Sequence, residues 1–163
     1  MRKHVVIMGV SSCGKSTVGE LLAQRTGLPF RDGDDMHPAA NIEKMASGQA
    51  LDDDDRKPWV YSSGRFLAEQ EAGAIVGCAA LKHSYRDIIR AAAPDTVFIH
   101  LHGSYELLKE RMSRRTGHFM PVSLLDSQFE TLEELRSEEA GLVLDVSATP
   151  EELAAAAAEY LQA

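Results

Sequence analysis

The segment from Gly9 to Ser16 constrains the fold of this chain more than any other feature. It reads Gly-Val-Ser-Ser-Cys-Gly-Lys-Ser and matches the pattern G-x-x-x-x-G-K-[ST] in full. The two glycines allow backbone angles and a close approach to phosphate that a Cβ would obstruct. An apolar run at 5–8 precedes the loop, and an amphipathic segment at 15–26, ending at Gly27, follows it. A strand, a glycine loop and a helix in this order form an anion site at the positive end of the helix dipole.

Apolar runs rich in β-forming residues alternate with helical patterns along the rest of the chain. The runs lie at 5–8, 28–30, 74–78, 96–101 and 142–146. Helices are predicted at 15–26, within 38–46, within 58–71, and at 82–92 and 104–114. A last helix follows Thr149 and Pro150 and includes the alanine run 154–158. This alternation predicts an α/β fold, a three-layer α/β/α sandwich with a five-stranded parallel sheet.

Size and charge limit the classes of protein that the chain can represent. Its 163 residues predict a single domain, 1–163. A net charge of −8 argues against nucleic acid or an anionic membrane as partner, and no run approaches the length of a membrane span. The two cysteines, Cys13 and Cys78, have no metal-ligand spacing, which favours a reduced, cytoplasmic location.

The loop predicts that the chain binds ATP with Mg²⁺. Lys15 can reach the β- and γ-phosphates, and the Ser16 hydroxyl can ligate Mg²⁺. The N-K-x-D tetrapeptide of guanine-specific proteins is absent, and the chain is short for a motor ATPase. The run 142–145 resembles a Walker B strand, but it precedes the last helix, so we interpret it as the last strand, leading into a loop that can border the adenine. A small-molecule kinase is the class that remains. The candidate nucleotide-binding residues in the loop are Gly9, Ser11, Ser12, Cys13, Gly14, Lys15, Ser16 and Thr17.

An acidic segment follows the second predicted strand. It runs from Asp32 to His37 and reads Asp-Gly-Asp-Asp-Met-His. Strand ends beside a phosphate loop are where such sheets bind ligands, and phosphoryl transfer needs a carboxylate to accept the proton of the attacking hydroxyl. A second carboxylate can hold water on Mg²⁺. The alternative is a solvated acidic turn.

Cations gather at three further places. Arg56 follows four aspartates, 52–55, of which we assign 52–54 mainly to a solvated face or a helix N-terminus, and its planar fork suits a carboxylate. Lys82 and Arg86 share one helix face and can hold an anionic substrate, or can pair at the surface with Asp87 and Arg90. A third group, around a predicted helix end, suits a lid over ATP, although basic residues also complement a helix dipole there. Its members are Arg111, Arg114 and Arg115.

Together these segments resemble the gluconokinase family of P-loop kinases, from about His4 to Glu133. The resemblance depends on 9–17, the run Asp-Gly-Asp-Asp-Met-His-Pro at 32–38, and Asp-Arg-Lys-Pro-Trp at 55–59. It continues through Ala-Leu-Lys at 80–82 with Tyr-Arg-Asp at 85–87, His-Phe-Met at 118–120, and Ser-Gln-Phe at 127–129. It implies transfer of the ATP γ-phosphoryl group to the 6-hydroxyl of D-gluconate. It also implies a nucleoside-monophosphate-kinase-like fold, a small helical lid at about 112–130, and a homodimer.

The resemblance also implies roles for individual residues. Asp34 becomes the candidate base and Asp32, with Ser16, the candidate Mg²⁺ site, although the assignment among Asp32, Asp34 and Asp35 can be exchanged. Lys15 and Arg115 join Asp34 as catalytic candidates, and Arg111 as a ligand of ATP. The candidate substrate-binding residues are Asp34, His37, Arg56, Lys82, Arg86 and His118.

The chain departs from the family pattern at several positions, among them Leu135, where the family often has a proline-containing turn, and three positions nearer the predicted site. Ser12 stands where the family usually has glycine, Cys13 where it usually has serine, and Ala79 where it tends to have serine. Two other functions stay open. One is a kinase of another small acid, such as shikimate; the other is a nucleotide-binding regulatory module without turnover.

Overall fold

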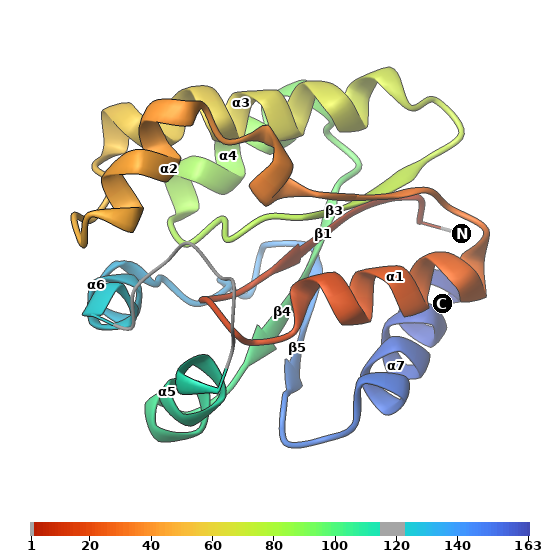
Figure 1. Cartoon of the computed structure of the whole chain (residues 1–163). Helices are drawn as coiled ribbons and strands as arrows, with labels where there is room; N and C mark the ends of the chain where they lie inside the picture. The colour runs from red at the N-terminus through yellow and green to blue at the C-terminus, as the bar shows by residue number, and fades with distance from the viewer. Residues whose placement is uncertain (1, 115–122) are drawn as a thin grey trace.

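The computed structural model describes residues 2–114 and 123–163, apart from the side chain of Asp34. Its strands form one parallel sheet in the order β2-β3-β1-β4-β5, so their carboxyl ends lie along one edge (Figure 1). The strands are β1 (His4–Met8), β2 (Phe30–Asp32), β3 (Ala74–Gly77), β4 (Val97–His102) and β5 (Gly141–Asp145). The helices are α1 (Lys15–Thr26), the 3₁₀ turn η1 (Gly33–Met36), α2 (Ala39–Ala46), α3 (Asp53–Glu69), α4 (His83–Ala92), α5 (Tyr105–Ser113), α6 (Ser123–Thr131) and α7 (Pro150–Gln162).

Helices cover both faces of this sheet, which confirms the predicted three-layer fold (Figure 1). Side chains alternate along β1 between the two faces. Val5 and Ile7 face a core formed with α1, α5 and α7, whereas Val6 and Met8 face a core formed with α3 and α4. Burial on both sides explains why the strands read as continuous apolar runs.

The third helix begins five residues before the predicted segment at Pro58. Asp52 caps α3: its side chain accepts the N–H of Asp55, and the Asp55 carboxylate accepts the N–H of Asp52. Such a capping box satisfies N–H groups that the first turn leaves open, and the acidic residues of that turn suit the positive end of the dipole. The interpretation of the aspartate run as a helix N-terminus is therefore confirmed.

Two further boundaries bear on the site. The last helix begins as predicted, with Thr149 in a second capping box and Pro150 in the first turn. Helix α6 lies almost entirely within the segment at about 112–130 that the resemblance assigned to a small helical lid, although no separate helix with its own bounds was predicted there. Among the helices of the described ranges, none is both long and apolar enough to span a bilayer.

Candidate active site

The glycine loop between β1 and α1 has the backbone angles that its pattern predicts. Gly9 has φ 148° and Gly14 has φ 98°, both in a region that residues with a Cβ rarely adopt. A Cβ on Gly9 would lie 2.6 Å from Cys13 Sγ and 2.8 Å from the carbonyl oxygen of Leu101. Ser12 also has a positive φ, 67°. A glycine at this position would relieve the strain that Ser12 bears.

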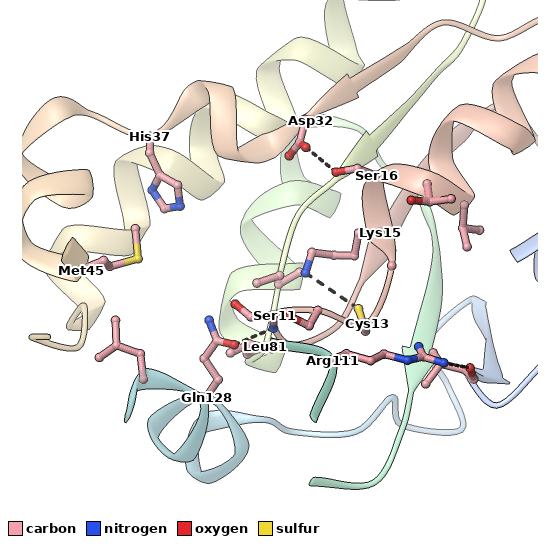
Figure 2. Close-up of a pocket in the computed structure, with 18 of the residues that line it drawn as sticks. Ser11, Cys13, Lys15, Ser16, Asp32, His37, Met45, Leu81, Arg111 and Gln128 are labelled. Carbon is pink, nitrogen blue, oxygen red and sulfur yellow. Dashed lines mark hydrogen bonds between the residues drawn. The ribbon is translucent and has the colours of Figure 1, made fainter. Parts of the chain in front are cut away.

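Lys15 folds its ammonium group back along the first residues of the loop. Its Nζ donates to the carbonyl oxygens of Gly9, at 3.0 Å, and Val10, at 3.1 Å, and lies 3.9 Å from Cys13 Sγ (Figure 2). These contacts keep the cation inside the loop, where it faces any phosphate that the loop amides bind.

Ser16 and Asp32, the two predicted Mg²⁺ residues, lie in direct contact. The Ser16 hydroxyl donates to Asp32 Oδ2 at 2.5 Å, which joins the start of α1 to the end of β2 (Figure 2). A hydroxyl and a carboxylate are hard oxygen donors of the kind that Mg²⁺ prefers, with phosphate and water as its other ligands. The described part of the chain holds no cluster of three or more histidine, cysteine, aspartate or glutamate side chains that could hold a metal by itself.

One cavity of about 390 Å³ opens beside the loop, a size within the range of small-molecule sites. The loop side of its wall is formed by residues 11–18. The loop between β5 and α7 contributes Val146 and Ala148, and Pro150 follows at the start of α7, in agreement with the interpretation that this loop borders the site. The remaining wall includes Asp32, His37, Met45, Leu51, Arg56, Trp59, Tyr85, Arg111, Leu124, Ser127, Gln128 and Leu153.

Trp59 of α3 holds the acidic segment at the cavity. Its Nε1–H donates to the carbonyl oxygen of Gly33 at 2.7 Å, and its ring stacks on His37 with 4.0 Å between the ring centroids. Gly33 packs so closely on β3 that a Cβ would lie 2.2 Å from the carbonyl oxygen of Gly77. Asp34 follows directly in η1, and its side chain lies outside the described part of the structure. The backbone of the candidate base is therefore positioned from two sides.

Arg56 lines the cavity and is 9% exposed. Its Nη1 donates to the hydroxyl of Tyr85 at 3.4 Å, and that hydroxyl donates to Asp53. Lys82 pairs with the same carboxylate at 2.8 Å and is not in the cavity wall. The hydrogen bond that the Lys82 ammonium donates to the Asp53 carboxylate lowers the pKa of Asp53 and raises the pKa of Lys82. The Lys82 ammonium, which we predicted to bind an anionic substrate, is therefore paired with the carboxylate of Asp53 in this structure.

The structure does not bring Arg86 to the cavity. Its side chain is fully buried, its Nε bonds Glu139 Oε2 at 2.7 Å, and its Nη1 bonds the carbonyl oxygen of Ala80 at 2.8 Å. Its Nη2 donates to the backbone carbonyls of Glu133 and Glu134. Because the Arg86 guanidinium is buried and already bonded to groups of the protein, this position argues against the predicted contact of Arg86 with substrate. Arg86 instead joins α4 to the chain between α6 and β5.

Glu139 is the partner that the sequence did not indicate. Burial raises the pKa of its carboxyl, but the hydrogen bonds and charge of Arg86, with smaller contributions from the Arg136 N–H and from His83, outweigh this and hold the pKa at about 2. Glu139 lies 53 positions from Arg86 in a segment without regular structure, so no local pattern could have shown the pair.

The arginine group near the end of α5 divides. Arg111 lines the cavity, and its Nη2 donates to the carbonyl oxygen of Val146 at 2.9 Å (Figure 2). Arg114 pairs with Glu110 on the exposed side of the same helix. Arg115 and His118 lie outside the described residues.

A residue that we did not predict, Gln128 of α6, is 8% exposed and lines the cavity. The Ser-Gln-Phe segment belonged to the resemblance, but the sequence assigned it no role.

Comparisons with known proteins agree with this geometry. A family model described as shikimate kinase matches residues 11–162. The thermosensitive gluconokinase of Escherichia coli is 46% identical over 142 residues, which cover 85% of this chain and 75% of that protein. The gluconokinase of Gluconobacter oxydans is 48% identical over 134 residues, which cover 80% and 75%. The chain belongs to the gluconokinase family.

Solved structures support the same placement in the gluconokinase family. A gluconokinase from Sinorhizobium meliloti has a TM-score of 0.90 at 48% identity and covers 99% of this chain and 92% of its own. A shikimate kinase from Aquifex aeolicus has a TM-score of 0.62 at 18% identity, which shows the shared fold alone. The resemblance inferred from the motifs is thus confirmed.

Proposed function

We propose that this protein transfers the γ-phosphoryl group of ATP to the 6-hydroxyl of D-gluconate, giving 6-phospho-D-gluconate and ADP. One observation carries the proposal beyond family membership. A single cavity is lined by the phosphate loop and also by Asp32, His37 and Arg56 of the acidic segment and α3. Donor and acceptor can therefore be held side by side, which is the main requirement of phosphoryl transfer.

The loop and the residues around it would hold the donor. Its backbone amides and Lys15 would bind the phosphates. Arg111 lines the same cavity and bonds Val146 of the β5–α7 loop, the loop that would border the adenine. Ser16 and Asp32 would hold Mg²⁺, which when bound neutralises charge on the phosphate oxygens. Arg115 is proposed as a further cation for the transferring group.

The opposite wall would hold the acceptor. Arg56 suits the carboxylate of a sugar acid, because its guanidinium is nearly buried and can form a bidentate pair. His37, held flat against Trp59, would face hydroxyl groups, and Asp34 would accept the proton of the attacking hydroxyl. Lys82 would contribute only after leaving Asp53. His118 and a lid at about 112–130 belong to the proposal, as do a homodimer and a cytoplasmic location.

A kinase of another small acid is the second candidate, and the match to the shikimate kinase family model favours it. A coupled assay of ADP release separates the two. The purified protein is supplied with Mg-ATP and either D-gluconate, other sugar acids or shikimate. Turnover with gluconate far above that with shikimate is expected. Turnover with shikimate alone would overturn the proposal, and ATP binding without transfer to any acid would favour a regulatory module.

The base is tested by two matched variants. Asp34→Asn removes the proposed proton acceptor and should lower kcat by orders of magnitude, roughly 10² to 10⁴, while ATP still binds. Asp35→Asn changes the exposed neighbour and should leave kcat near that of the wild type. If Asp35→Asn is the inactive variant, the base is Asp35. Near-normal turnover of both would remove the base from this pair.

A further inference from the structure

Gln128 of α6 bonds directly to the phosphate-binding loop, 117 positions away in the sequence. The backbone N–H of Ser11 donates to Gln128 Oε1 at 2.7 Å, and both residues are more than nine-tenths buried. An N–H group needs an acceptor, so the carboxamide oxygen must be the atom that faces Ser11. Figure 2 shows the Gln128 side chain extending from α6 toward the loop within the cavity.

This contact occupies a group that the loop uses for phosphate. Backbone N–H groups of such a loop bind phosphate oxygens, so Gln128 Oε1 lies where a phosphate oxygen would lie. The position of Lys15 indicates which phosphate. Its ammonium, the group that reaches the β- and γ-phosphates, lies against the carbonyls of Gly9 and Val10, directly before Ser11. The Ser11 end of the loop is therefore the end that faces the terminal phosphate.

We propose that Gln128 is a catalytic residue that recognises the terminal phosphate of ATP. Without nucleotide, its oxygen accepts the Ser11 N–H. When ATP binds, an oxygen of the terminal phosphate takes this N–H, because a charged acceptor forms the stronger hydrogen bond. The Gln128 carboxamide then turns and donates an N–H to the same phosphate. This inference rests on the proposed function, since it needs ATP as the donor.

The chemistry of the side chain and the packing of α6 support the exchange. A carboxamide carries both acceptor and donor, so one rotation changes its partner, whereas a buried carboxamide left unpaired would be costly. Leu124, one turn earlier in α6, is buried with Met45 of α2 and Leu51 in a small apolar cluster. This cluster keeps α6 at the cavity when the bond to Ser11 is exchanged. Gln128 therefore remains within reach of the phosphate.

The first test replaces Gln128 with methionine, which has similar length and neither donates nor accepts strongly. The contact with Ser11 is absent from the ATP complex, so its loss alters the affinity for ATP but not kcat at saturating ATP and acceptor. Loss of the donor to the transferring group should lower kcat by roughly tenfold to a hundredfold, the effect of one hydrogen bond to a charged group. The Kd for ADP should stay within about twofold, because ADP lacks the terminal phosphate.

A second variant, Gln128→Glu, places a negative charge at the same position. Its carboxylate still accepts the Ser11 N–H but repels the terminal phosphate, so the Kd for ATP should rise by roughly tenfold or more, and that for ADP much less. Glu130→Gln, on the exposed side of α6, is the matched control and should change neither constant. Both Kd values are measured without acceptor by calorimetry, with circular dichroism to confirm folding.

Two results would overturn the role of Gln128. One is a kcat of Gln128→Met within about twofold of the wild type, a change below the effect of one hydrogen bond. The other is an equal loss of ATP and ADP affinity in Gln128→Glu, which a merely structural role would produce. The proposed function is tested separately by wild-type turnover with gluconate. If that fails, the ATP and ADP affinities still decide whether Gln128 senses the terminal phosphate.

Discussion

Replacing Glu139 with glutamine should test whether the buried pair with Arg86 stabilises the fold. The Glu139 side chain is 4% exposed and that of Arg86 is fully buried. Arg90 also reaches Glu139 Oε2, at 3.2 Å, and His83 Nδ1 lies 2.6 Å from Oε1. The substitution keeps the shape of the side chain but removes its charge, so it leaves the Arg86 guanidinium buried without a counter-ion.

The pKa of Glu139 gives the magnitude. Burial raises it, and the contacts with Arg86 lower it more, from the usual 4.5 to about 2. At about 1.4 kcal/mol for each tenfold change in the proton equilibrium, this corresponds to about 3 kcal/mol at neutral pH. Loss of one partner of a buried pair generally costs a similar amount, about 3–5 kcal/mol. In a chain of this size the melting temperature should fall by about 6–12 °C.

The pH dependence has a definite sign. The carboxylate has a lower pKa in the folded state, so its stabilisation is fully present above pH 4.5 and is lost as the pH falls from there toward 2. Glutamine does not titrate. The difference in free energy of unfolding between the wild type and Glu139→Gln should therefore be constant between pH 7 and about pH 5.5 and should shrink below pH 4.5.

Urea unfolding followed by tryptophan fluorescence measures this difference, since the single tryptophan, Trp59, is 4% exposed. Glu138→Gln, an exposed neighbour, is the control and should change stability little. A cost below about 1 kcal/mol at pH 7, or a difference that does not shrink at low pH, would refute the reasoning. At temperatures where the variant is folded, the KM for gluconate should be unchanged, because Arg86 lies outside the cavity wall.

Three smaller perturbations follow from the site. Trp59→Phe should lower the free energy of unfolding by about 1–3 kcal/mol, measured by circular dichroism, because it leaves the Gly33 carbonyl without its donor. Asp52→Ala removes the cap of α3 and should cost about 1 kcal/mol in the same experiment, and a cost near zero would contradict the cap. Asp32→Asn should raise the Mg²⁺ concentration needed for half-maximal turnover; an unchanged Mg²⁺ requirement would argue against its role at the metal.

Much of the fold could be predicted from local patterns. The glycine loop, the apolar strands and the Thr149–Pro150 helix start each depend on residues close in sequence, and they lie at or near their predicted positions, except that β2 (Phe30–Asp32) begins at the last residue of the run predicted at 28–30. The helical segment was predicted within 58–71, whereas α3 begins at Asp53, five residues earlier, with Asp52 and Asp55 forming the cap. Proline is tolerated inside this helix, and the periodic pattern alone did not show the earlier turn.

Part of the site could also be predicted from local sequence patterns. Asp32, His37 and Arg56 line the cavity with the loop, because they follow strand ends or motifs that the sequence displays directly. Arg86 was misplaced because its spacing from Lys82 shows a shared helix face but not which neighbour that face meets. Its partner, Glu139, approaches from a segment 53 residues away.

The sequence by itself determined that the chain is a P-loop kinase of the gluconokinase family, because the loop and the neighbouring motifs are short and contiguous. Only the tertiary structure decided how the charges are used. It placed Arg86 in an internal ion pair and Lys82 on Asp53, and it brought Gln128 to the amide of Ser11. Pairings over such separations depend on how the helices pack on the sheet, and no local pattern of residues encodes that packing.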